Sequence, residues 1–100
     1  MATPRRTTIT VETHRGVFMI SVAAELAEMH PQTLRMYEAR GLIEPQRSPK
    51  NTRLYSQRDV ERLRRIQEMT AEGLNLAGVE RVLTLERRVA ELERRLDGTA

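Results

Sequence analysis

Residues 30–42, HPQTLRMYEARGL, predict a short helix whose two ends are both marked. Pro31 suits the first helical position, where its missing N–H costs nothing, and Gly41 suits the left-handed residue that ends a helix. At about 100° per residue, Leu34 and Tyr37 fall on one side of this helix, and Gln32, Met36, Ala39 and Arg40 on the other. One side can therefore pack on a core while the other offers hydrogen-bonding groups outward. An ordinary amphipathic surface helix has the same pattern, so the neighbouring segments must decide its role.

The composition describes one small domain, or a smaller domain with an extended element. The chain has 100 residues, of which 39% are apolar and 31% charged, and chains of this length bury a modest core. It has no cysteine, which excludes disulfides, thiolate metal sites and cysteine-based catalysis. Its two histidines, His14 and His30, lack the spacing of a metal pair, and no nucleophile–base pair or carboxylate cluster stands out. We therefore predict no catalytic residue, no metal and no other cofactor.

Positive charge gathers on the predicted helix and on the segment after it. The net charge is +3, but residues 31–65 hold nine Lys and Arg against four Asp and Glu. A phosphate-binding surface requires such a distribution, although a solvated face can also show it. No stretch approaches the roughly 20 apolar residues of a membrane span, and the first residues lack the apolar core of a signal peptide. We expect a cytoplasmic protein with no membrane partner.

The segments before residue 30 predict an arm and a first helix. Residues 1–16 show no sustained period and predict a flexible, mildly basic arm. The apolar run 17–20 could form a strand, and Ser21 offers an N-cap for a helix through Met29. Only a residue or two around Pro31 separates the two helices, because proline disfavours the helical conformation in the residue before it. So tight a turn predicts a helix-turn-helix, with the second helix presented to the major groove of DNA.

Residues 46–55 combine turn formers with basic residues and end in β-type residues. They predict a small hairpin, or wing, with Lys50 at its tip and Arg47 and Arg53 on its flanks. A solvated surface loop is the alternative, and its position directly after a helix-turn-helix favours the wing.

Two further helices are predicted. Ser56 caps the first, with Asp59 completing a shortened capping box, and Glu72-Gly73 ends it. Its buried side is marked by Val60, Leu63, Ile66 and Met69. Asn75 caps the last helix, which we expect to run to about Leu96.

The last helix carries a narrow apolar seam at spacings of 3, 4, 3 and 4 residues: Val82, Leu85, Val89, Leu92 and Leu96. Packing against its own domain accounts for Val79 and for Val82 or Leu83, but not for Val89 onward, so we predict a homodimer. The domains follow as an arm (1–16), a winged helix-turn-helix domain (17–74), a dimerisation helix (75–97) and a tail (98–100). One helix cannot enclose a ligand pocket of a few hundred Å3, so no small-molecule effector is expected.

At this point the sequence resembles the MerR family of transcriptional regulators. The resemblance rests on motifs at residues 20–23, 31–43, 53–60 and 73–76, in order and with the expected gaps. It implies a mainly α fold, a winged helix-turn-helix with a small β wing and a C-terminal dimerisation helix, which forms an antiparallel coiled coil in the family. Within the family the chain is most similar to the heat-shock repressors. These bind an inverted repeat in double-stranded DNA, repress chaperone operons and use the Hsp70 chaperone DnaK as co-repressor.

Carried over by position, the resemblance implies DNA contacts from two sets of residues. They are Gln32, Thr33, Arg35, Met36, Tyr37 and Arg40 on the second helix, and Arg47, Lys50, Asn51, Arg53 and Tyr55 in the wing. Two positions depart from the family pattern. Met36 stands where many relatives have a tyrosine, which replaces a phenol contact by an apolar one. His30 stands where many have a serine, so we expect weaker capping of the helix there.

These observations predict a sequence-specific, dimeric DNA-binding regulator, a repressor of heat-shock genes, and not an enzyme. An excisionase-like architectural DNA-binding factor shares the winged fold but usually lacks a dimer helix. A coiled-coil adaptor without DNA binding is a further alternative. Salt distinguishes the adaptor, because phosphate contacts make DNA affinity fall steeply with salt and an adaptor has no such affinity to lose.

Overall fold

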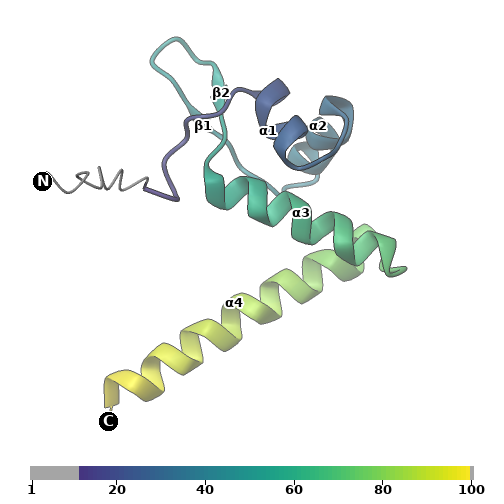
Figure 1. Cartoon of the computed structure of the whole chain (residues 1–100). Coiled ribbons are helices and arrows are strands. Elements are labelled where there is room, and N and C mark those ends of the chain that lie inside the picture. The colour runs from purple at the N-terminus through teal and green to yellow at the C-terminus, as the bar shows by residue number, and fades with distance from the viewer. Residues whose placement is uncertain (1–11, 100) are drawn as a thin grey trace, which may run out of the picture.

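The computed structural model describes residues 12–99 of the chain. They form α1 (Ile20–Leu26), α2 (Pro31–Ala39), β1 (Gln46–Arg47), β2 (Arg53–Leu54), α3 (Gln57–Ala71) and α4 (Leu76–Thr99). α1, α2 and the hairpin lie on one side of α3, and α4 extends away from this head as a long rod (Figure 1). The mainly helical chain with one small sheet confirms the predicted fold class. Residues 1–11 of the predicted arm lie outside the described residues.

α1 begins and ends earlier than predicted. Its N-cap is Met19, which makes no side-chain capping bond, and not Ser21. It ends at Leu26, and Glu28, with a φ of 57°, turns the chain toward α2. Burial falls on small residues, with Ala23, Ala24 and Ala27 almost fully buried and Val22 and Leu26 partly exposed. The early start has a tertiary cause, because Phe18 pairs with Tyr55 in an isolated β-bridge and the chain becomes helical directly after this attachment.

α2 has the predicted ends. Pro31 is its first residue, and Gly41 follows its C-terminus with a φ of +77°. His30 does cap the helix, because its Nδ1 accepts a hydrogen bond of 3.0 Å from the backbone N–H of Gln32. Leu34 and Tyr37 are buried as predicted.

The predicted wing is present as a two-stranded antiparallel hairpin. Gln46 pairs with Leu54, and Arg47 pairs with Arg53. The backbone N–H of Asn51 donates to the Ser48 carbonyl at 2.8 Å, and Asn51 takes a φ of 64° that suits asparagine in a tight turn. Of the apolar run 17–20, only Phe18 takes part in β-pairing.

The segment before α1 is attached to the wing by one side chain of the wing, that of Gln46. Gln46 Oε1 accepts from the Gly16 N–H at 2.8 Å, and Gln46 Nε2 donates to the His14 carbonyl at 2.8 Å. A Cβ on Gly16 would lie 2.9 Å from both Gln46 Oε1 and the Leu54 carbonyl oxygen. Glycine is therefore needed at position 16 for this close approach.

α3 is the central support of the head. The capping box at its start is confirmed, because Ser56 Oγ accepts from the Asp59 N–H at 3.0 Å and Asp59 Oδ2 accepts from the Ser56 N–H at 2.9 Å. The four residues predicted for its inner side, Val60, Leu63, Ile66 and Met69, are all buried. Arg64 donates two hydrogen bonds, of 2.6 and 3.1 Å, to the Leu26 carbonyl at the end of α1. α3 thus holds the helix-turn-helix by packing and by hydrogen bonds to its backbone.

α4 is longer than predicted. Asn75 caps it, because its Oδ1 accepts from the Gly78 N–H at 2.8 Å. The helix continues through Asp97 and Gly98 to Thr99, so the predicted end at about Leu96 is wrong. A single glycine near a helix end costs only about 1 kcal/mol relative to alanine and does not by itself end the helix.

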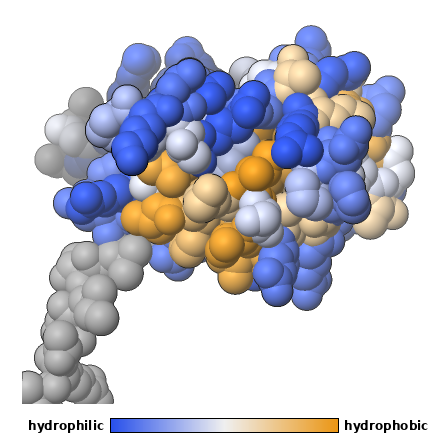
Figure 2. Space-filling model, turned by 90° about the horizontal axis from the view of Figure 1, so that it is seen from above, coloured by the Kyte–Doolittle hydropathy of each residue, from blue (hydrophilic) through white to orange (hydrophobic). Residues whose placement is uncertain are grey.

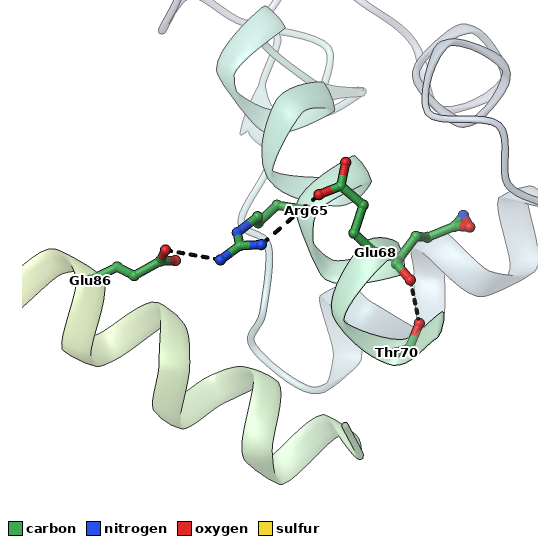
Figure 3. Close-up of polar contacts among 5 residues, drawn as sticks. Arg65, Glu68, Thr70 and Glu86 are labelled. Atoms are coloured by element: carbon green, nitrogen blue, oxygen red, sulfur yellow. Dashed lines mark hydrogen bonds and ion pairs between the residues drawn. The ribbon is translucent and has the colours of Figure 1, made fainter. Parts of the chain in front are cut away.

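Only the first part of α4 packs on the head. Val79 and Leu83 are buried, and Val82 packs against the core from a partly buried position. Arg65 of α3 joins the two helices, with its guanidinium 3.1 Å from Glu86 of α4 and 3.9 Å from Glu68 of its own helix (Figure 3). Beyond Leu83 the seam residues are exposed, with Leu85 at 61%, Val89 at 52%, Leu92 at 43% and Leu96 at 71%.

Candidate nucleic-acid interface

The outward side of α2 carries most of the residues predicted to contact DNA. Gln32, Arg35, Met36 and Arg40 are exposed and Thr33 is half-buried. The helix can take this position because Leu34 and Tyr37, on its opposite side, are packed in the core. Polar donors therefore project outward from a helix that is rigidly supported, as a recognition helix requires.

A shallow notch lies where α2 meets the wing, and arginines from both elements converge on it. Its volume is about 210 Å3, and it is lined by Met19, Ile20, Arg35, Arg47, Asn51, Thr52 and Arg53. The structure thus brings together one predicted contact residue of α2 and three of the wing. Guanidinium groups bind phosphate through paired N–H donors, so the notch suits a phosphate of the DNA backbone. The remaining predicted residues, among them Lys50 and Arg40, do not line it.

Arg53 is attached to the recognition helix. Its Nε lies 3.0 Å from Glu38 Oε1 and 2.9 Å from Glu38 Oε2. The hydrogen bond and charge of Glu38 raise the pKa of the Arg53 guanidinium above its usual value. The wing arginine therefore remains charged and is held at one side by α2.

Two residues that the resemblance assigned to DNA contact are core residues in this structure. Tyr37 is 4% exposed and Tyr55 is fully buried; the Tyr55 hydroxyl is itself buried, so it presents no phenol to a ligand. Both were assigned by motif position alone, and their rings are instead needed to fill the space among α2, the wing and α3. The Tyr55 hydroxyl makes no hydrogen bond within residues 12–99. Burial, and then the negative charge of Glu38, raises the pKa of Tyr55.

Sequence reasoning missed four residues of this surface. Met19, Ile20 and Thr52 line the notch, and Glu38 holds Arg53. Met19 reaches the notch because the Phe18–Tyr55 bridge brings the segment before α1 beside the wing, and this is a non-local pairing. An acidic residue within a basic surface was a usable signal for Glu38, because such a residue generally has a cationic partner nearby.

The surface of the head also includes apolar side chains. Seen from above, hydrophobic residues gather at the centre of a hydrophilic border (Figure 2). Exposed apolar residues of the head include Met19, at 56%, and Met36, at 47%. Apolar side chains on a recognition surface can contact the methyl group of thymine.

A helix-turn-helix with a wing, and arginines of both around one notch, defines the chain as a winged helix-turn-helix DNA-binding protein. Residues 18–86 match the family model described as MerR HTH family regulatory protein. The chain therefore belongs to the MerR family of transcriptional regulators.

Curated relatives include a putative heat shock protein HspR of Streptomyces coelicolor. The chain is 49% identical to it over 92 residues, which cover 84% of this chain and 61% of that protein. It is also 33% identical over 75 residues to the HTH-type transcriptional regulator GlnR of Bacillus cereus, covering 75% of this chain and 58% of GlnR. The chain thus spans less than two thirds of the length of these two relatives.

Two solved structures share the fold. The transcription regulator PbrR691 from Ralstonia metallidurans CH34, in complex with lead(II), is 31% identical with a TM-score of 0.69, and the match covers 82% of this chain and 68% of that chain. HiNmlR, a MerR family regulator lacking the sensor domain and bound to promoter DNA, has a TM-score of 0.62 at 24% identity, covering 80% of this chain and 78% of that chain. The family and these relatives are transcription regulators and not enzymes.

Neither a metal site nor a membrane span is found in the part of the chain that the structure describes. Residues 12–99 contain no group of three or more His, Asp or Glu side chains arranged to hold a metal ion. None of their helices combines the length and the apolar character needed to cross a membrane.

Proposed function

We propose that this MerR-family protein is a dimeric, sequence-specific repressor of heat-shock or chaperone genes that binds an inverted-repeat operator. The observation that carries DNA binding is the notch in which Arg35 of α2 and Arg47 and Arg53 of the wing converge. The identity of 49% with HspR supports the assignment to heat-shock genes.

The operator contact is tested by Arg35→Ala. Arg35 is exposed on α2 and lines the notch, so its loss should cost about 1–3 kcal/mol of operator affinity and relax base preference. Fluorescence anisotropy with a labelled operator measures this, and Arg94→Ala, on the exposed outer part of α4, is a matched control that should have little effect. Equal affinities for Arg35→Ala and the unchanged protein would reject α2 as the recognition helix. An intact dimer with no affinity for any DNA would favour the coiled-coil adaptor.

Dimerisation through α4 is proposed because its seam is exposed in the single chain. Leu85, Val89 and Leu92 lie beyond the part of α4 that packs on the head, and each is more than 40% exposed. A two-fold dimer presents two recognition helices to the two halves of an inverted repeat. Leu92→Glu places a charge in the seam and should give monomers in sedimentation or light scattering, with weaker operator binding. Arg94→Glu, outside the seam, should leave the dimer intact, and a dimeric Leu92→Glu variant would place the interface elsewhere.

The Hsp70 chaperone DnaK is the proposed co-repressor. Support comes from the likeness to HspR and from the form of α4, a single helix whose two hollows within residues 12–99, along residues 77–85 and 82–93, are open to solvent. A protein partner can act by binding the DNA-competent form and so shifting the equilibrium toward it. Operator affinity should be measured with and without the chaperone, on this chain and on any longer natural form. Affinities that the chaperone never changes would reject this co-repressor while leaving DNA binding in place.

A further inference from the structure

We propose that Glu38 is a positioning residue, which holds Arg53 so that the recognition helix and the wing bind DNA as one rigid unit. This inference rests on the proposed DNA binding. It goes beyond it by giving a role to Glu38, which does not itself contact the DNA. The carboxylate of Glu38 lies on α2 and the guanidinium of Arg53 on β2, with Nε–O distances of 3.0 and 2.9 Å. The Glu38 side chain is 17% exposed and that of Arg53 is 41% exposed.

The wing needs such an attachment because it is short. Each strand has two residues, and an isolated two-stranded hairpin is at best marginally stable in water. The Phe18–Tyr55 bridge fixes the base of the hairpin. The Glu38–Arg53 pair adds a further attachment, on the side that faces α2.

The geometry of the pair leaves the two Nη groups of Arg53 available to bind a phosphate. Only Nε is hydrogen-bonded to Glu38, and within residues 12–99 no hydrogen bond is made by the two Nη groups. Arg53 also lines the notch, beside Arg35 and Arg47. A phosphate in the notch can thus meet the Nη donors while Glu38 keeps its hold on Nε.

Positioning gives affinity because an arginine side chain loses rotamer freedom when it is fixed. If Glu38 fixes Arg53 in the free protein, this cost is met during folding and not during DNA binding. A carboxylate that simply neutralised Arg53 would have the opposite effect, and its removal would strengthen DNA binding. The two roles therefore predict changes of opposite sign.

The test measures the affinity of four variants of the full chain for an operator duplex at several salt concentrations. The variants are Glu38→Ala, Glu38→Gln, Arg53→Ala and the double variant that combines Glu38→Ala with Arg53→Ala. Glu38→Ala should weaken binding by about 5- to 10-fold, and Glu38→Gln by less, since its amide oxygen still accepts from Nε. The double variant should bind no more weakly than Arg53→Ala, because Glu38 acts only through Arg53. Glu44→Ala is the matched control, since it removes an exposed carboxylate of the same head that makes no hydrogen bond or ion pair within residues 12–99.

The salt dependence separates positioning from a general loss of structure. Arg53→Ala should reduce the slope of log affinity against log salt by about 1, because one phosphate contact is lost. Glu38→Ala should keep the slope of the unchanged protein, because the charge of Arg53 remains. Unchanged or tighter binding by Glu38→Ala, or additive losses in the double variant, would overturn the inference alone. If the protein without any substitution bound no duplex, the proposed function would be overturned as well.

Discussion

Replacing Tyr55 by phenylalanine should stabilise the protein, because the Tyr55 hydroxyl is buried without a hydrogen-bond partner. The side chain is fully buried, and its hydroxyl makes no bond to any of residues 12–99. Phenylalanine keeps the ring in the same packing and removes only the unpaired polar group. The change therefore isolates the contribution of the hydroxyl.

The magnitude follows from the cost of burying a polar group. An unsatisfied buried hydroxyl costs about 1–3 kcal/mol, and the small gap left by the missing oxygen offsets part of the gain. We expect a net gain of about 1 kcal/mol. For a domain of this size, that gain raises Tm by about 4–8 °C.

The difference between the two proteins should grow at alkaline pH. Burial raises the pKa of Tyr55 in the folded protein, while a tyrosine in the unfolded chain ionises near pH 10. Above about pH 10 the unfolded chain releases a proton that the folded chain retains, so the stability of the unchanged protein falls as pH rises toward the folded pKa. Tyr55→Phe lacks this proton and should lose less stability over the same range.

Thermal denaturation followed by circular dichroism, at pH 7 and at about pH 10.5, measures both effects. Tyr37→Phe is the matched control, because Tyr37 is also buried but its hydroxyl is not both buried and unpaired. A lower Tm for Tyr55→Phe at pH 7 would refute the argument, since it would mean that the hydroxyl is satisfied in solution. Weaker operator binding by Tyr55→Phe at unchanged stability would show that the phenol contacts DNA, and would reverse its assignment to the core.

Three further substitutions test local features of the fold, each by urea or thermal denaturation. Gly16→Ala should lower Tm by several degrees, because its Cβ would lie 2.9 Å from Gln46 Oε1; an unchanged Tm would mean that this attachment of the wing is dispensable. His30→Ala should cost about 1 kcal/mol by removing the cap of α2, and His30→Asn should restore it; equal losses in both variants would reject the capping role. Arg64→Ala should cost about 0.5–1.5 kcal/mol because the exposed Leu26 carbonyl loses two charged donors, and an unchanged stability would show that water replaces the guanidinium.

The features predicted correctly from the sequence are those that depend on neighbouring residues. Pro31 and Gly41 mark the ends of α2 because each has a backbone preference of its own. Ser56 and Asp59 form a capping box because Asp59 stands three positions after Ser56. The tip of the wing follows in the same way from its turn-forming residues.

The features that were missed depend on residues far apart in the chain. Capping preference predicts that α1 begins after Ser21, whereas the pairing of Phe18 with Tyr55 makes the chain helical directly after Met19. Tyr37 illustrates the same limit for the site. The helical pattern predicts that it packs against the core, whereas the resemblance implies that it contacts DNA. The ring is buried in the tertiary core, which confirms the helical pattern.

By itself, the sequence determined the order of the elements, the face that α2 turns to the core and the exposed seam of α4, because these follow from short-range preferences and helical period. Only the tertiary structure decided which charged groups meet. Arg53 and Glu38 are 15 residues apart, and Gln46 and Gly16 are 30 apart. Such pairs depend on how α2, the wing and the segment before α1 pack around α3. No local preference encodes a distance of 3 Å between them.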